Sequence, residues 1–254
     1  MLMILQKYTK KRIFVLFLQK KREIFFTEMI NIKIDPRILA VCPQIQIGIL
    51  NANVENSKTP DTLWQEIEDE ASKIASTYQL LEINQRPAIV ATRKLYKSLG
   101  KDPGRYRVSS EALCRRIIRG LGLYRLTSLI DIVNLVSIKS GYAISGLDAG
   151  KLVGDTLTMG VGEKDEQYCG IGRGSLNIEG LPVYRDALGP VATPTSDEER
   201  TKFTEATTTA QININAFGPE MPLEQAVEWT ATLLKRYAHA THVETAIHVP
   251  NQIE

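Results

Sequence analysis

Cysteine and histidine are scarce in this sequence of 254 residues, which contains three of each. The cysteines are odd in number and widely spaced, so they predict free thiols in a reducing compartment and argue against a disulfide framework. The histidines all fall within residues 239–248, without a cysteine or carboxylate cluster at metal-ligand spacing. We therefore expect a cytoplasmic protein with no metal site and no cofactor.

Long apolar runs are also missing. Near the N-terminus, Ile13–Leu18 is apolar over only six residues, against about 20 for a membrane span, and basic residues follow at once. The segment also lacks the small-residue cleavage site of a signal peptide. We expect residues 1–28 to be an extension outside the fold, with an amphipathic helix at a membrane surface as the alternative. The period-2 pattern after Met29 then opens a single domain over residues 29–254.

Several enzyme motifs are absent from the sequence. It contains no nucleophile elbow, no Walker A loop and no synthetase class motif. The glycine-rich segment CGIGRGS (169–175) is followed by a strand pattern and not by a helix, so it predicts a hairpin turn and not a phosphate-binding loop. We therefore expect that this chain does not activate an amino acid on its own.

The charge is distributed unevenly along the chain. Composition is ordinary for a globular protein with a core, at 43% apolar and 24% charged residues. The net charge of +2 conceals a block at residues 86–125 that carries +9 and a following part, residues 126–254, that carries −8. Such a concentrated block favours a local contact with phosphate over a general coating of nucleic acid.

Apolar spacing predicts helices first and a strand-rich second half, an order typical of an α+β fold. Thr59 is the expected N-cap of the first long helix, and Ser109 or Ser110 that of a later one. Helices are expected over residues 61–80, 87–99, 109–119, 128–139 and from Pro222 onward. Strands are expected over residues 30–34, 44–51, 207–218 and 242–249, with short strands and glycine turns between residues 141 and 186.

The basic block places like charges on two neighbouring helices and on the loop between them. Arg115 and Arg119 are four residues apart and face the same way, with Arg116 alongside. Such charges repel one another unless a phosphate backbone or an acidic surface meets them. We predict a nucleic-acid contact here, and the alternative is a solvated face paired with acids of residues 126–254. The predicted contact set is Arg93, Lys97, Arg105, Arg115, Arg116 and Arg119.

The most specific pattern in the chain is formed by residues 122–134, GLYRLTSLIDIVN, and residues 140–152, SGYAISGLDAGKL. It resembles the opening segment of the B3/B4 tRNA-binding, editing domain of the phenylalanyl-tRNA synthetase beta subunit. One position departs from that pattern, because the histidine of the family is Ser145 here. The resemblance extends over residues 85–240, more weakly after 155, and implies a central antiparallel sheet flanked by helices. The matching residues are Gly122, Thr127, Ser128, Asp131, Asn134, Gly141, Ile144, Gly146, Leu147, Asp148, Lys151 and Leu152.

The resemblance implies binding of tRNA or aminoacyl-tRNA, with hydrolysis of a mischarged tRNA in trans as the activity. Such hydrolysis needs a positioned water and oxyanion stabilisation more than a strong nucleophile. On this basis Asn134, Ser145 and Asp148 are the candidate catalytic residues, and the basic set contacts the tRNA.

A pocket carboxylate is also implied within residues 189–200, where the sequence singles out no residue. Two alternatives to the editing function stay open. One is a non-catalytic binding module for a small ligand resembling an amino acid, which the loss of the histidine favours. The other is an accessory protein whose acidic half binds a protein partner.

Overall fold

The computed structural model describes residues 29–250. Every element described below belongs to the unit that begins at Asn31. The extension expected over residues 1–28 lies outside the described residues, so its boundary stays a prediction. Within the described part of the chain, no helix combines the length and apolar character that crossing a membrane requires.

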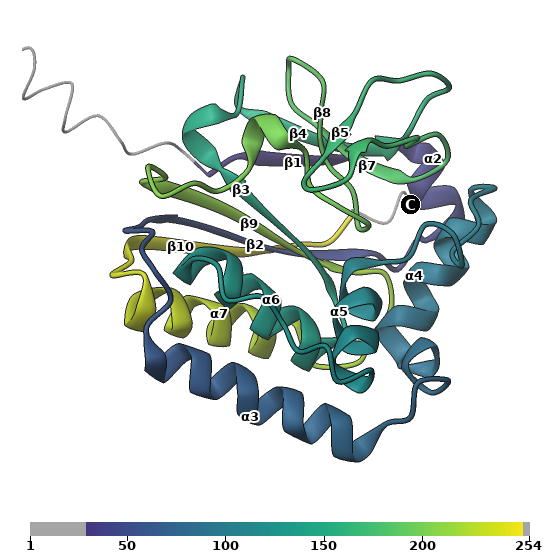
Figure 1. Cartoon of the computed structure of the whole chain (residues 1–254). Helices are drawn as coiled ribbons and strands as arrows, with labels where there is room; N and C mark the ends of the chain where they lie inside the picture. The colour runs from purple at the N-terminus through teal and green to yellow at the C-terminus, as the bar shows by residue number, and fades with distance from the viewer. Residues whose placement is uncertain (1–28, 251–254) are drawn as a thin grey trace, which may run out of the picture. The chain divides into compact units, whose positions relative to one another are not determined.

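A four-stranded antiparallel sheet forms the middle of this unit (Figure 1). Its strand order is β10-β2-β9-β3, so β9 is paired on both sides while β3 and β10 are edge strands. The strands are β2 (Gln46–Asn53), β3 (Ala143–Asp148), β9 (Thr209–Ala216) and β10 (Thr241–His248).

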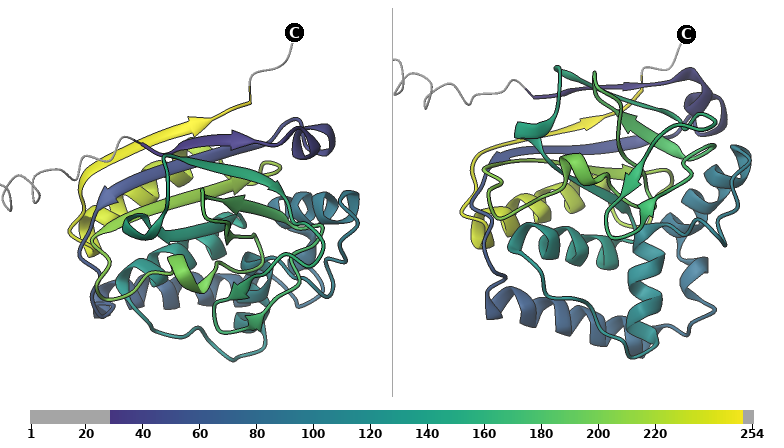
Figure 2. Two further views of the ribbon diagram at one scale, coloured as in Figure 1. Left: turned by 90° about the horizontal axis from the view of Figure 1, so that it is seen from above. Right: turned by 45° about the horizontal axis from the view of Figure 1, so that its top comes forward.

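A second four-stranded sheet covers one face of this central sheet (Figure 2). Its order is β1-β4-β7-β8, with β1 and β4 parallel and the other pairs antiparallel. The strands are β1 (Asn31–Ile34), β4 (Thr156–Val161), β7 (Pro182–Arg185) and β8 (Pro190–Ala192). A separate hairpin of β5 (Cys169–Gly170) and β6 (Gly174–Ser175) confirms the turn predicted from the glycine-rich segment.

Helices cover the opposite face of the central sheet (Figure 1). α7 contacts β2 and β9, α6 packs on α7 and β3, and α3 lies against α5 and α6. The α+β class expected from the sequence is confirmed, with helices on one face of the central sheet and a second sheet on the other. The helices of this layer are α3 (Asp61–Thr77), α4 (Pro87–Ser98), α5 (Ser109–Ile118), α6 (Ser128–Ser140) and α7 (Leu223–Tyr237), whereas α2 (Pro36–Val41) contacts β4 of the second sheet.

The strand β9 is buried on both faces, although its sequence alternates strictly between apolar and polar residues. The apolar face, with Ile212 and Ile214 fully buried, packs into the main core with the helices. The other face carries Gln211, Asn213 and Asn215, each at most 1% exposed. A polar face of this kind is usually solvated in an antiparallel sheet, and here the second sheet covers it instead.

Two predicted N-caps are wrong. Pro60 caps α3, and the Thr59 hydroxyl donates to the buried carboxylate of Asp131 instead. Val108 precedes α5, so Ser109 is the first residue inside that helix. For Thr59, a tertiary contact, which periodicity does not reveal, competes with the local capping rule.

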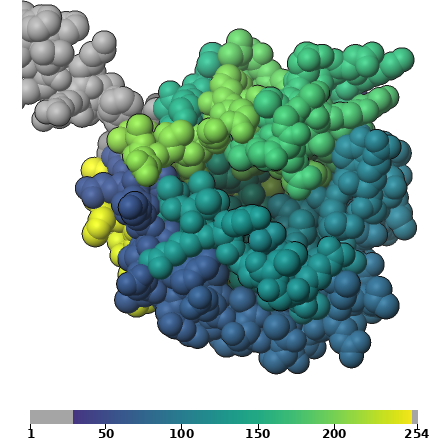
Figure 3. Space-filling view, viewed as in Figure 1, coloured from purple at the N-terminus to yellow at the C-terminus, as the bar shows by residue number. Residues whose placement is uncertain are grey.

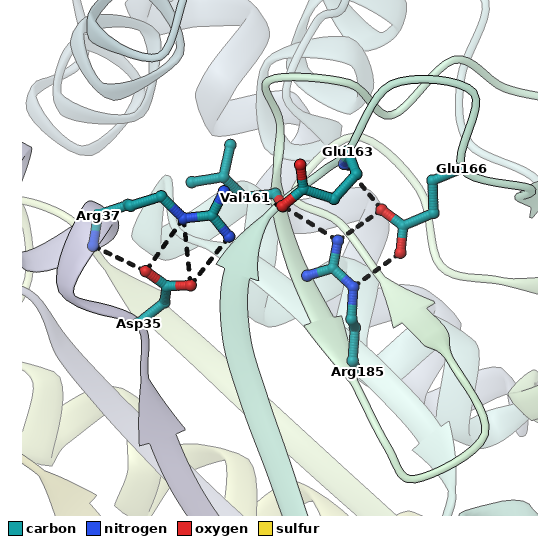
Figure 4. Close-up of polar contacts among 6 residues, drawn as sticks. All are labelled: Asp35, Arg37, Val161, Glu163, Glu166 and Arg185. Atoms are coloured by element: carbon teal, nitrogen blue, oxygen red, sulfur yellow. Dashed lines mark hydrogen bonds and ion pairs between the residues drawn. The ribbon is translucent and has the colours of Figure 1, made fainter.

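Ion pairs connect the loop after β4 to α2 and β7 (Figure 4). Arg185 of β7 donates to both oxygens of Glu166, with Nε–Oε1 at 2.7 Å, and to the Val161 carbonyl at 3.0 Å. Arg37 bonds Asp35 beside it and reaches Glu163, with Nη1–Oε1 at 2.8 Å. These contacts hold the second sheet together at the side where β1 and α2 begin the fold.

Candidate functional site

A cavity of about 300 Å³ opens beside the edge strand β3. Figure 3 shows the hollow between the teal atoms of α5 and α6 and the green atoms of the segments above them. Three parts of the chain meet there: one face of α5 and α6, the free side of β3, and the loops at residues 171–173 and 193–203. The lining residues are Ser109, Leu113, Leu126, Ile130, Val133, Asn134, Ser137, Ile144, Gly146, Ile171, Arg173, Thr193, Thr195, Ser196, Asp197, Lys202 and Phe203.

One wall of this pocket is apolar. Leu113 comes from α5, Ile130 and Val133 come from α6, and Ile144 comes from β3. Phe203 closes the wall against the strand, because a Cβ built on Gly146 would lie 2.5 Å from its ring. A glycine is therefore required at position 146 for the ring to contact the strand.

The opposite wall is a polar turn held in place by several hydroxyl groups. The Thr193 hydroxyl accepts from the backbone N–H of Thr195 and Ser196 and donates to the Ser196 carbonyl. Tyr168 also donates to that carbonyl, at 2.6 Å, and Tyr96 shares a hydrogen bond with Thr195 at 3.0 Å. These contacts fix the backbone of residues 193–196, and this fixed backbone positions the side chain that comes next in the chain.

Asp197 is that side chain, and it lies against the free edge of β3. Its Oδ2 accepts from the Gly146 backbone N–H at 3.0 Å. Burial raises the pKa of Asp197 to about 7, while this N–H and the Ser145 side chain lower it in part. A carboxyl group that titrates near neutral pH is suited to accept and return a proton.

The three predicted catalytic residues fall in three different places. Asn134 lines the pocket from α6. Ser145 is 1% exposed and is not part of the lining, but its side chain lowers the pKa of Asp197 in part. Asp148 lies at the end of β3, where it accepts from the Gly150 N–H and the Thr207 hydroxyl. The structure therefore brings Asn134 and Ser145 toward one site and places Asp148 in its own turn.

The predicted basic set divides into paired and exposed members. Arg93 and Arg115 both point at Glu111 of α5, a side chain only 2% exposed, with nitrogen–oxygen distances of 2.8 and 3.7 Å. Arg107 makes a third contact with the same carboxylate at 3.4 Å. The pairing partner of these arginines is thus a residue of the basic block itself, whereas Arg86, the first residue of the block, pairs with Glu220 of the acidic second half at 2.7 Å.

The other members of the basic set lie nearer the surface. Lys97, Arg105 and Arg119 are exposed. Arg116 is half-buried, with its guanidinium over the Tyr124 ring at 4.1 Å from the centroid. One carboxylate therefore serves several arginines, and the surplus positive charge faces solvent.

Asp197 is the functional candidate that the sequence did not identify. It lies within residues 189–200, where the resemblance implied a pocket carboxylate, but three consecutive acids stand there and only one lines the pocket. The serine and threonine residues before it are a signal of a structured turn, since such side chains commonly bond their own backbone. That signal predicts a fixed loop and does not indicate which acid the loop presents.

Comparisons with known proteins give a family and a distant structural neighbour. The family described as B3/4 domain matches residues 91–242. Among solved structures, an N-terminal fragment of the phenylalanyl-tRNA synthetase beta-subunit from Pyrococcus horikoshii aligns with a TM-score of 0.43 and 14% identity. The alignment covers 85% of this chain and 50% of the fragment, so the chain corresponds to half of that fragment's length. No curated protein matches the sequence.

Removing the shared carboxylate is expected to destabilise the protein. Glu111→Gln leaves the guanidinium groups of Arg93, Arg107 and Arg115 close together without their anion. We expect the free energy of unfolding to fall by about 3 kcal/mol, as when one partner of a buried ion pair is removed. Chemical denaturation measures the change, with the exposed Glu205→Gln as the control, expected to stay within about 0.5 kcal/mol. Equal stability of the two variants would mean that solvent already screens the arginines.

The raised pKa of Asp197 predicts a pH dependence of stability. Between the unfolded value of 3.8 and the folded value of about 7, the folded state binds the proton more tightly, so its stability falls as pH rises through this window. Asp197→Asn lacks the titrating group. The variant should gain stability relative to the parent by about 1 kcal/mol for each pH unit in the window. Parallel stability–pH curves from denaturant titrations would contradict the assignment.

Proposed function

This chain belongs to the B3/4 domain family, and on that premise we propose that its pocket binds the aminoacyl end of a charged tRNA and hydrolyses the ester bond. One observation carries the proposal. Asp197, with its pKa raised to about 7, stands on the polar wall of a pocket whose other wall is apolar. An aminoacyl ester has the matching parts, namely an amino acid side chain, a reactive carbonyl and a sugar–phosphate end.

The reaction requires only a positioned water and a proton acceptor, because the ester is already activated. The Asp197 carboxylate takes a proton from a water molecule while the oxygen of that water attacks the ester carbonyl carbon. The bond to the ribose oxygen then breaks, and that oxygen receives the proton from Asp197. General acid–base help of this kind contributes typically 10²–10⁴-fold.

Asn134 supports this chemistry from the facing wall. Its side-chain amide on α6 lines the same pocket as Asp197. An amide N–H donates to a developing oxyanion or to the attacking water without changing its own charge. Ser145, at the position where the family pattern has histidine, acts on the carboxylate and not on the substrate in this proposal.

Positive side chains at the pocket suit the phosphate of a nucleotide end. Arg173 and Lys202 both line the cavity, and Arg173 is exposed. The exposed Lys97, Arg105 and Arg119 extend the positive charge over the helices α4 and α5 and the loop between them. We propose that this surface contacts the tRNA backbone, while Arg93 and Arg115 stabilise the helices through Glu111.

Hydrolysis is tested with purified protein and a panel of tRNAs, each charged with a different amino acid. We expect deacylation above background for at least one member of the panel. Asp197→Asn should lower that rate by about 10²-fold or more, since it removes the proton acceptor. Asn134→Ala should lower it by a smaller factor, and Asp148→Asn, outside the pocket lining, serves as the control with little change.

The panel also separates the enzyme from a binding module. Deacylation by the parent protein that is unaffected in Asp197→Asn would contradict the assigned acceptor. If no charged tRNA of the panel is deacylated above background but aminoacyl-tRNA is still bound, the protein is a non-catalytic module that recognises the aminoacyl group.

RNA binding is tested by salt-dependent affinity. Changing Lys97, Arg105 and Arg119 to Gln together should weaken tRNA binding and reduce the slope of log K against log salt by about 0.9 for each phosphate that is no longer neutralised. A control variant with equal reduction of charge changes the exposed Lys33, Lys164 and Lys235 to Gln. The same slope in both triple variants would place the tRNA on another surface.

A further inference from the structure

The segment between α5 and α6 places an exposed apolar patch, formed by Leu121, Tyr124 and Leu126, at the mouth of the pocket. These side chains are 57%, 64% and 50% exposed. Leu126 also lines the pocket, so the other two residues lie a short way along the chain from its opening. Single exposed apolar residues are common on protein surfaces, but a group of them beside a cavity indicates a ligand or a partner.

Hydrogen bonds anchor both ends of this segment despite its exposure. Arg116 of α5 donates from Nη2 to the Leu121 carbonyl at 3.3 Å. The backbone N–H of Leu126 donates to Oδ2 of Asp131 at 3.0 Å, and Asp131 is only 1% exposed. The apolar side chains are therefore presented by an anchored segment and not by a fraying loop.

Tyr124 is the aromatic member of the patch. It is the only exposed aromatic side chain among residues 29–250. The guanidinium of Arg116 lies over its ring, 4.1 Å from the centroid. With 64% of the residue exposed, the opposite face of the ring is open to solvent. A ring with an arginine on one face and solvent on the other is suited to the stacking of a nucleobase.

The charge around this ring favours one kind of occupant. From Arg115 to Leu126 the chain carries four arginines and no acid. Arg119 and Arg125 are both exposed, and Arg125 pairs with Asp61 at 2.5 Å. The exposed Arg173 also lines the pocket. This surplus of positive charge fits an anionic ligand that carries aromatic bases, namely single-stranded nucleic acid. The same surplus would repel a second copy of this segment.

We propose that Tyr124 is a stacking platform for the base of the terminal nucleotide of a single-stranded RNA end, while the pocket beside it takes the aminoacyl group. The base and the ester are attached to the same ribose, so the base must lie at the pocket mouth and not inside the pocket. The chain from Leu126 to Tyr124 spans at most about 7 Å, which keeps the stacked base next to the pocket. The terminal position of this base rests on the proposed function, whereas the stacking rests on the ring and its charges alone.

Four RNA tetranucleotides of otherwise identical sequence test this proposal. They combine an adenine or an abasic site at the 3′-terminal nucleotide with the presence or absence of an amide-linked amino acid on its ribose. All four carry the same phosphates, so the ratio of dissociation constants between abasic and adenine probes measures the contribution of the base and not that of the ionic contacts. We expect the full-length protein to bind the adenine probes roughly tenfold to hundredfold more tightly, the range that stacking on an aromatic ring supplies.

Substitutions at Tyr124 assign the effect to this ring. Tyr124→Ala should bring the ratio close to one, whereas Tyr124→Phe, which keeps the ring, should preserve it. Leu188→Ala, at a residue that is 67% exposed and outside the pocket lining, is the control and should leave the ratio unchanged. Because both positions are exposed, all three variants should melt like the parent protein.

Equal binding of the adenine and abasic probes by the parent protein would overturn the proposal, as would a base effect that persists in Tyr124→Ala. Failure of all four probes to bind would overturn it as well. Self-association of the chain that Tyr124→Ala abolishes, without a base effect, would assign the patch to a second copy and also contradict the platform.

The amino acid provides a separate readout of the pocket. A base effect without an amino acid effect would support the platform and contradict the aminoacyl pocket. An amino acid effect without a base effect would contradict the platform and leave the proposed function in place. The two failures are therefore distinguished in one set of measurements.

Discussion

The burial of both faces of β9 is the constraint on which this structure depends. Its apolar face packs against the helices, as an alternating strand normally does. Its amide face carries Gln211, Asn213 and Asn215, which lose water when they are covered. An unpaired buried polar group costs about 1–3 kcal/mol, so the cover must supply hydrogen bonds as well as contact. The second sheet does this in part, through the Tyr184 hydroxyl that donates to Asn215 at 2.7 Å.

The pocket follows from how this second sheet is connected. After β8, the chain passes through the hydroxyl-rich turn and reaches the free edge of β3. There it brings an acid, Asp197, and an aromatic ring, Phe203, to the strand within a few residues. The helices α5 and α6 provide the remaining walls. A pocket between an edge strand, a helix face and a rigid loop combines an apolar surface with fixed polar groups, as binding sites commonly do.

Much of the local structure could be predicted from the sequence, because helices α3 to α7 and the strands of the central sheet follow apolar periodicity. The site could be predicted only in part. Asn134 belongs to a local motif and does line the pocket. Asp197 belongs to no local sequence motif. Its neighbours in space, Gly146 and Ser145, lie about fifty residues earlier in the chain and meet it only through the topology of two sheets.

The charge pattern also left the tertiary contacts of the charged residues unpredicted. The helical spacing of the basic block was visible in the sequence, but the pairing of Arg93 with Glu111 joins two helices and depends on how they pack. The alternation of Gln211, Asn213 and Asn215 with apolar residues was likewise visible in the sequence. The burial of these three amides, however, depends on a sheet formed by other parts of the chain. Local rules therefore indicate which side chains share a face, and tertiary packing decides whether that face meets solvent, another element or a ligand.

The central claim is that the cavity beside β3 receives an aminoacyl ester. The most direct measurement is NMR mapping of the parent protein with a non-hydrolysable analogue, an amino acid joined by an amide to the ribose of adenosine. We expect saturable shift changes at Asp197, Asn134 and Gly146, with binding that weakens when the amino acid is removed from the analogue. Changes confined to other surfaces, or equal binding of adenosine alone, would contradict it.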